Sequence, residues 1–249
     1  LMQGNGYEAV KLTIIGSILG TIAIVIISPV LFLYIDPIYN AIRVFIPYLL
    51  ILASFFLIYK EKYKIWAFVI FLISGILGIL TFNISNVKEV LLPLLSGLFG
   101  LSSLILSIRN KIKIPKQIIS KDKIKELNLS NSIGIGLVAS ILVGFLPGLG
   151  SAQGAALASS VSKKRSNKSF LIIIGSIDTI IMILSIIAFY SIERARSGAV
   201  VAISRIIPTF TAQQIILFIS VILISAGISS ISTLYITRYI ANKISKLNY

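Results

Sequence analysis

The stretch GFLPGLGSAQGAALASS (residues 144–160) decides the fold expected for this chain, because it interrupts an otherwise apolar helical sequence. Pro147 removes a backbone donor and disfavours helix at the residue before it. Gly148 and Gly150 permit backbone angles that other residues resist. The flanking segments, 133–146 and 150–161, are short for a ~30 Å hydrocarbon core at about 1.5 Å per residue. We therefore expect a broken, re-entrant helical hairpin that enters the membrane and returns to the same face.

Long apolar runs surround this stretch in a chain of 249 residues that is 57% hydrophobic, with a mean hydropathy of +1.00. Runs of this length predict transmembrane helices. The first transmembrane helix is expected to end at Pro29. A short apolar segment at residues 199–208 contains Arg205. The expected spans are residues 9–27, 44–59, 66–82, 90–108, 170–190 and 214–236.

The fold class predicted from these runs is all-α, a polytopic transmembrane helical bundle. We expect one membrane domain in two parts. Residues 1–131 hold four transmembrane helices and a basic cytoplasmic loop. Residues 132–249 hold the re-entrant hairpin, at the Pro-Gly-x-Gly motif, and the C-terminal transmembrane helices.

The composition excludes most enzyme chemistry. The chain has no cysteine and no histidine, so it has no thiol nucleophile, no histidine metal ligand and no Ser-His pair. Asp178 is the one acid inside an apolar run, which disfavours a two-aspartate protease. We expect a protein that is not an enzyme, with no catalytic residue, no metal site and no cofactor.

The distribution of charge predicts the orientation. The net charge of +15 comes from Lys and Arg residues between the apolar runs, so it indicates anionic lipid headgroups and not nucleic acid as the partner. Placing the N-terminus inside puts most of these residues in the cytoplasm. KKRSNK (residues 163–168) joins them only if residues 132–161 return to the face they entered. We expect a multi-pass protein of the cell membrane, with loop 109–131 lying on lipid.

The tip of the hairpin is the first candidate site. The N-terminus of a half-helix presents unpaired N–H groups and a partial positive charge, which suit an anion. Ser151 is a candidate N-cap, and Gln153 offers two donors and an acceptor. Close packing of small residues is the alternative, as we also expect at two glycine pairs. The candidate substrate-binding residues are Pro147, Gly148, Gly150, Ser151 and Gln153; the glycine pairs are Gly16 with Gly20 and Gly97 with Gly100.

Asp178 is the second candidate, because a charge at membrane depth costs about 3 kcal/mol on insertion scales and indicates a function. It suits proton transfer, Na⁺ binding or pairing with a cation, with Ser176 and Thr179 completing an ion-coupling cluster. The alternative is a neutral or paired structural aspartate. Arg196, in ERARSGA (residues 193–199), is an auxiliary anion contact or an ordinary interfacial charge.

The break, the small residues after it and the Arg-Ser-Gly-Ala element carry a resemblance to a known family. Together with FLIIIGSIDTIIMILSIIAFYSIERARSGAVVAI (residues 170–203), they resemble the archaeal TctA-like family. Its members are relatives of the large permease subunit of tripartite tricarboxylate transporters. The start, LMQGNGYEAVKLTIIGSILG (residues 1–20), is similar to the middle region of that family.

The resemblance implies a membrane permease subunit of a secondary transporter for an anionic, carboxylate-like organic solute, driven by an ion gradient. The family has two related halves, each with a Pro-Gly break, so this chain is expected to be a C-terminal portion. Asp178 stands where the family leads us to expect asparagine. The implied partners are a small membrane subunit or a solute-binding protein, beside membrane lipids and a second copy in a homodimer. The alternatives are a translocase for a polyprenyl phosphate or similar lipid carrier, and a non-transporting membrane scaffold subunit.

Overall fold

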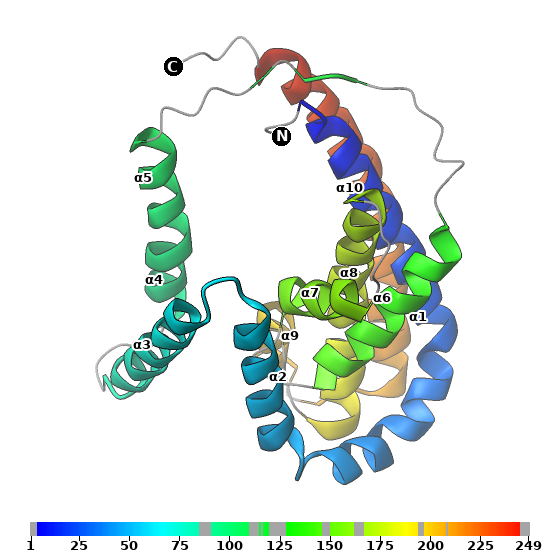
Figure 1. Ribbon diagram of the computed structural model, residues 1–249. Helices are drawn as coiled ribbons and strands as arrows, with labels where there is room; N and C mark the ends of the chain where they lie inside the picture. Colours follow the sequence, from blue (N-terminus) through cyan, green and yellow to red (C-terminus); the bar gives the residue numbers. More distant parts are fainter. Residues whose placement is uncertain are drawn as a thin grey trace. The chain divides into compact units, whose positions relative to one another are not determined.

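The structure is a computed structural model, and it describes residues 4–84, 91–109, 115, 117–119, 128–145, 150–161, 167–193, 197–207 and 209–244. Its regular elements are helices (Figure 1). Leu1–Pro47 and Ile114–Asn248 form one compact unit, and Tyr48–Lys113 forms a second one with Tyr249. The helices are α1 (Gly6–Ile42), α2 (Ile46–Lys60), α3 (Lys64–Phe82), α4 (Leu91–Leu95), the π-helix η1 (Ser96–Leu101), α5 (Ser102–Arg109), α6 (Leu129–Phe145), α7 (Ser151–Val161), α8 (Asn167–Ile192), α9 (Gly198–Ser204) and α10 (Ala212–Ile244).

Four segments are long and apolar enough to cross a membrane: Gly6–Tyr34, Lys64–Phe82, Asn167–Ser191 and Ala212–Ile244. Shorter apolar helices cover Ile46–Lys60, Pro93–Arg109 and Leu129–Gly144. The prediction of an all-α, multi-pass membrane protein is therefore confirmed.

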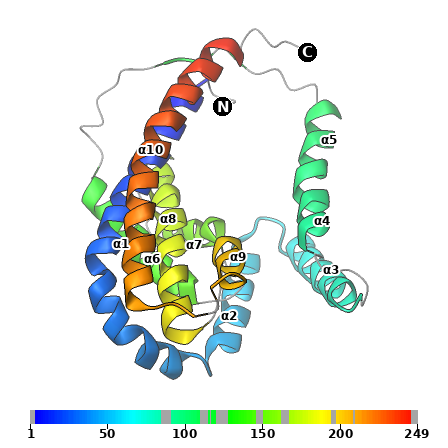
Figure 2. The same ribbon diagram turned by 180° about the vertical axis from the view of Figure 1, so that it is seen from behind.

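Helix α1 is longer than expected. The prediction that the first helix ends at Pro29 is wrong, because α1 continues through Pro29 and Pro37 to Ile42. An internal proline removes one hydrogen bond and bends a helix, and transmembrane helices tolerate this more readily than soluble ones. Figures 1 and 2 show the consequence: α1 runs beside α10 and then curves in its C-terminal part.

Helices α1 and α8 pack with their backbones in contact. A Cβ added to Gly16 would lie 2.1 Å from the carbonyl oxygen of Ile172, and one on Gly175 would lie 2.1 Å from that of Thr13. Small residues allow this approach between membrane helices. The predicted packing role is confirmed for Gly16 and Gly20. Around Gly97 and Gly100 a Cβ would meet no atom of the described residues within 4 Å, so contacts inside their own unit do not support a packing role for them.

Two apolar clusters extend this contact around α8. On one side Ala139 of α6 and Ala155 and Ala158 of α7 pack with Ile173 and Ile177. Toward the C-terminal end of α8, residues of α8, α9 and α10 form a second cluster together with Phe210. Its aromatic centre is Phe210, whose ring meets that of Phe189 edge-on at 4.7 Å between centroids. Helix α8 is thus the central helix of its unit.

The second unit holds α2, α3 and the segment from α4 to α5. Helix α3 has no buried residue among those described, and its surface is largely apolar, as lipid-facing helices require. The turn between α2 and α3 carries basic and aromatic side chains, with the Lys64 ammonium 4.2 Å from the centre of the Tyr59 ring. Such side chains are typical of the membrane–water interface.

Candidate functional site

Two short helices flank the interrupted stretch. Helix α6 has 17 residues and ends at Phe145, and α7 has 11 residues and begins at Ser151. At about 1.5 Å per residue they are ~25 and ~16 Å long, shorter than a hydrocarbon core. Pro147 and Gly148 lie outside the described residues. Helices α6 and α7 thus lie on either side of the expected break, and the re-entrant hairpin that returns to the same membrane face stays a prediction.

The start of α7 is capped by Gln153. The N–H of Gly150 donates to the side-chain oxygen of Gln153 at 3.0 Å, and the N–H of Gly154 donates to the Gly150 carbonyl oxygen at 3.0 Å. This is the glutamine half of a capping box, in which the third helical residue reaches back to the N-cap N–H. Gly150 therefore occupies the cap position that the sequence suggested for Ser151. The other first-turn N–H groups have no partner within the helix.

The same turn packs tightly on its neighbours. A Cβ on Gly154 would lie 3.0 Å from a methyl carbon of Val143 in α6 and 3.5 Å from one of Ile177 in α8. Gly154, one of the small residues after the break, thus has the close-packing role that the sequence offered as the alternative to an anion site. Because Gly154 contacts Ile177, the first turn of α7 lies at the level of Asp178 along α8.

Asp178 and Ser176 lie in different surroundings. The Asp178 side chain is exposed, and no hydrogen bond or ion pair from a described residue reaches its carboxylate. Ser176 is fully buried and donates to the carbonyl oxygen of Ile173 at 2.8 Å. A Cβ on Gly136 would lie 2.1 Å from the Ser176 hydroxyl oxygen. Ser176 is therefore a contact between α8 and its neighbours, on a different side of the helix from Asp178.

Thr179 belongs to a group of hydroxyls between α1 and α8. Its hydroxyl donates to the carbonyl oxygen of Ser17 at 3.1 Å, which also accepts from the Thr21 hydroxyl at 2.8 Å. The Ser17 hydroxyl in turn donates to the carbonyl oxygen of Gly175 at 3.1 Å. Sequence reasoning missed Ser17 and Thr21. Their position one residue after Gly16 and Gly20 was the available signal, because those glycines mark the face of α1 that contacts α8.

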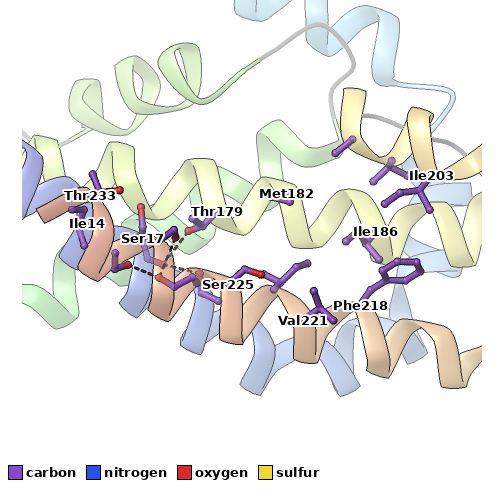
Figure 3. Close-up of a pocket in the computed structure, with 17 residues that line it drawn as sticks. Ile14, Ser17, Thr179, Met182, Ile186, Ile203, Phe218, Val221, Ser225 and Thr233 are labelled. Atoms are coloured by element: carbon purple, nitrogen blue, oxygen red, sulfur yellow. Dashed lines mark hydrogen bonds between the residues drawn. The ribbon is translucent and has the colours of Figure 1, made fainter. Parts of the chain in front are cut away.

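A cavity of about 600 Å³ lies between α1, α8, α9 and α10 (Figure 3). Ser17, Thr179 and Ser225 lie toward one end in this view, and Ile203 and Phe218 toward the other. The hydroxyl-bearing lining residues are Ser17, Thr21, Thr179, Ser225, Ser229, Ser230 and Thr233. None of the described residues that line the cavity is charged, so it has a polar neutral end and an apolar end.

The Arg-Ser-Gly-Ala element begins α9. Ser197 is the N-cap of this helix, and its hydroxyl oxygen accepts from the N–H of Val200 at 3.3 Å. Arg196 lies outside the described residues, so its role as an anion contact stays a prediction. Arg205 is the C-cap of α9 and is exposed. The described part of this element thus serves to start α9 against α8.

The fold defines a multi-pass helical membrane protein in which two short helices, α6 and α7, flank the interrupted stretch. The chain belongs to the tripartite tricarboxylate transporter TctA family, whose model matches residues 1–249. It is 31% identical over 253 residues to an uncharacterised protein of the archaeon Methanocaldococcus jannaschii. That match covers 100% of this chain and 62% of the relative, so the chain spans less than two thirds of the relative's length. No solved structure matches the chain.

The family confirms the resemblance found in the sequence. It is a family of transporters and not of enzymes, in agreement with the expectation of a non-enzyme. The apolar helices and the family together establish a multi-pass membrane protein of the TctA family.

Proposed function

We propose that this chain is a permease part of a secondary transporter that moves an anionic, carboxylate-like organic solute with an ion gradient. The observation that carries the proposal is the start of α7, a half-helix that begins after a break inside a TctA family chain. Unpaired N–H groups and the helix dipole make such an end attractive to carboxylates. Broken helices of other transporters bind anionic substrate groups in this way.

Gly150, Ser151 and Gln153 are the described residues of the proposed solute site. Because Gln153 holds the Gly150 N–H, the N–H groups of the following residues remain to bind one end of the solute. Pro147 and Gly148 complete the tip, and Arg196 is the proposed auxiliary contact. These three assignments rest on the sequence alone.

The negative charge of Asp178 can couple solute binding to ion binding. An organic anion at the start of α7 and a carboxylate at the same level of α8 repel each other. The repulsion is strong where water is scarce, about 4 kcal/mol for unit charges 4 Å apart at an effective dielectric of 20. A proton or cation that neutralises Asp178 therefore favours solute binding, and each ligand raises the affinity for the other.

The remaining partners are proposed from the family. The family is named for a tripartite transport system, which suggests a small membrane subunit and a solute-binding protein as partners of the whole transporter. Membrane lipids surround the apolar helices, and a homodimer is a further proposed assembly. No specific observation favours the lipid-carrier translocase or the scaffold subunit.

The proposal is tested with two substitutions at one position. Gln153→Glu keeps an oxygen that accepts from the Gly150 N–H but adds a negative charge beside the proposed solute. We expect its KM for uptake of labelled di- or tricarboxylates into proteoliposomes to rise at least tenfold. Gln153→Ala removes the cap and should lower stability by about 1 kcal/mol.

The chain offers a matched control at the start of α10. The side-chain oxygen of Gln214 accepts from the N–H of Thr211 at 2.9 Å, which repeats the capping geometry of Gln153. Gln214→Glu therefore makes the same change outside the hairpin and should leave KM unchanged. Equal KM values for Gln153→Glu and Gln214→Glu would contradict the proposed solute site.

A further inference from the structure

We propose that the cavity between α1, α8, α9 and α10 is a groove for one anionic membrane lipid, whose hydrocarbon chain lies along α10 and whose phosphate lies at Lys11. The inference goes beyond the proposed function, because it concerns a resident ligand of the protein and not the transported solute. None of the described residues that line the cavity belongs to the start of α7, so the two proposals can fail separately.

The lining of the cavity suits hydrocarbon. The surface that it exposes is almost wholly apolar, and none of the described lining residues is charged. Its hydroxyls donate to main-chain carbonyl oxygens, as the fully buried Thr21 does to Ser17 at 2.8 Å and Ser229 does to Ala226 at 3.3 Å. A hydroxyl whose proton is held by its own helix can face an apolar neighbour without an unpaired donor. The groove therefore favours an apolar ligand over a hydrated ion.

The cavity is elongated and opens at the surface of α10. Its lining follows this helix from Phe218 to Thr233, about 22 Å at 1.5 Å per residue, and Figure 3 shows lining residues strung along the helix. One edge of the opening consists of exposed residues four apart: Val221, Ser225, Ser229 and Thr233. Because α1, α8 and α10 each hold a segment long enough to cross a membrane, the groove lies at bilayer depth. An empty groove would deprive its lining of dispersion contacts that an extended hydrocarbon chain supplies.

Lys11 supplies a positive charge next to one end of the groove. It lies three residues before the lining residue Ile14, so the two side chains are neighbours on α1. Lys11 is partly buried and forms no ion pair with a described acid, and Glu8 pairs instead with Lys168 at 2.6 Å. The N-terminus of α1 and the C-terminal end of α10 lie at the same end of this unit (Figures 1 and 2), where the charge distribution predicts the cytoplasmic surface. Basic residues at that surface attract anionic lipid headgroups.

An anionic lipid matches both features of the groove. It combines a chain for the apolar lining with a phosphate for Lys11, and the bilayer supplies it to the opening. A small carboxylate would occupy little of a cavity of about 600 Å³ and would meet no cation among the described lining residues.

The test is native mass spectrometry of the purified full-length protein, released from detergent micelles after incubation with equal amounts of phosphatidylglycerol and phosphatidylcholine. We expect one retained lipid, with a preference for phosphatidylglycerol. Lys11→Gln should lower that preference about fivefold, whereas Lys11→Arg should keep it.

A second variant fills the groove itself. Ser225→Leu combined with Ser229→Leu places two larger side chains along its edge and should reduce the retention of both lipids. Both positions are exposed on α10, so the added side chains do not strain a core. Ser220→Leu is the matched control, since this exposed α10 residue does not line the cavity.

Equal lipid retention by the double-leucine variant and by Ser220→Leu would overturn the groove as the binding site. A preference for phosphatidylglycerol that survives Lys11→Gln would overturn the placement of the phosphate. Retention of no lipid, or of a second polypeptide that the double-leucine variant loses, would overturn the lipid assignment. Because the measurement uses no carboxylate, lipid retention without carboxylate uptake would refute the proposed function and leave the lipid site standing.

Discussion

Asp178 is the residue whose charge the proposed ion-coupled permease would have to neutralise in lipid. It lies at the level of the first turn of α7 and directly precedes Thr179 of the cavity. A carboxylate at membrane depth costs about 3 kcal/mol, and a bound proton or cation offsets that cost. The charge of this one side chain therefore couples the proposed solute site to a proton or cation.

Asp178→Asn should separate solute transport from the ion gradient. The amide keeps the size of the side chain but removes its charge, so the repulsion that a cation or proton relieves is lost. We expect uptake that no longer depends on Na⁺ or pH, measured in proteoliposomes across both variables. Asp36→Asn, at an exposed position in α1, is the control. Unchanged coupling in Asp178→Asn would make this acid structural.

The sequence predicted that residues 176–179 of α8 matter for the proposed ion coupling, but it did not predict that their side chains lie in different surroundings. Ser176, Asp178 and Thr179 are close in sequence, which suggested one polar cluster. A helix turns by about 100° per residue, so Ser176 and Thr179, three residues apart, lie on neighbouring positions of one face, and Asp178 points to another side. Ser176 enters the packing against α6, Asp178 is exposed, and Thr179 joins Ser17 across the α1 contact. The rotation of α8 against its neighbours is a tertiary property that one sequence does not reveal.

Among the elements, the contact of α1 with α8 is the one that positions the cavity. It depends on glycines that allow main chain to touch main chain, since lipid offers little hydrophobic force between helices. The Ser17 and Thr179 hydrogen bonds then cross this contact and fix its register.

Gly16→Ala should destabilise the protein by about 1–3 kcal/mol, the usual cost of overpacking. The new Cβ would lie 2.1 Å from a backbone oxygen of α8, so the two helices have to separate. The Cβ of Gly75→Ala in α3 would meet no atom of the described residues within 4 Å, so this variant should be neutral or slightly stabilising, because alanine favours helix. Thermal unfolding of the Gly16→Ala and Gly75→Ala variants measures both changes in stability. A neutral Gly16→Ala would show that the helices are not packed this closely.

The elements were largely predictable from local chemistry. The short helices on either side of the break follow from Pro147 and the glycines, and the long ones follow from length and hydropathy. The end of α1 was not predictable in this way, because a helix in lipid continues through Pro29 when its neighbours tolerate the lost hydrogen bond. The packing of Gly97 and Gly100 was not predictable either, because their partners depend on tertiary contacts.

The whole molecule has a predicted orientation that labelling can test. If residues 132–161 enter and leave the membrane from one face, single cysteines at positions 164 and 248 are both cytoplasmic. Both should react with an impermeant thiol reagent only when the inner face is accessible. The natural chain has no cysteine, so labelling has no background. A cysteine at position 36 should label from outside, and opposite sides for 164 and 248 would refute the hairpin.

Ligand-dependent thermal stabilisation is the most direct measure of whether this chain binds a carboxylate. The purified full-length protein would be heated with di- and tricarboxylates, amino acids and polyprenyl phosphates in turn. A ligand at a hundred times its Kd adds about 2.7 kcal/mol, which corresponds to a shift of several degrees. We predict a selective shift with a small carboxylate. A shift with lipid phosphates alone, or none with any compound, would contradict the proposed carboxylate site.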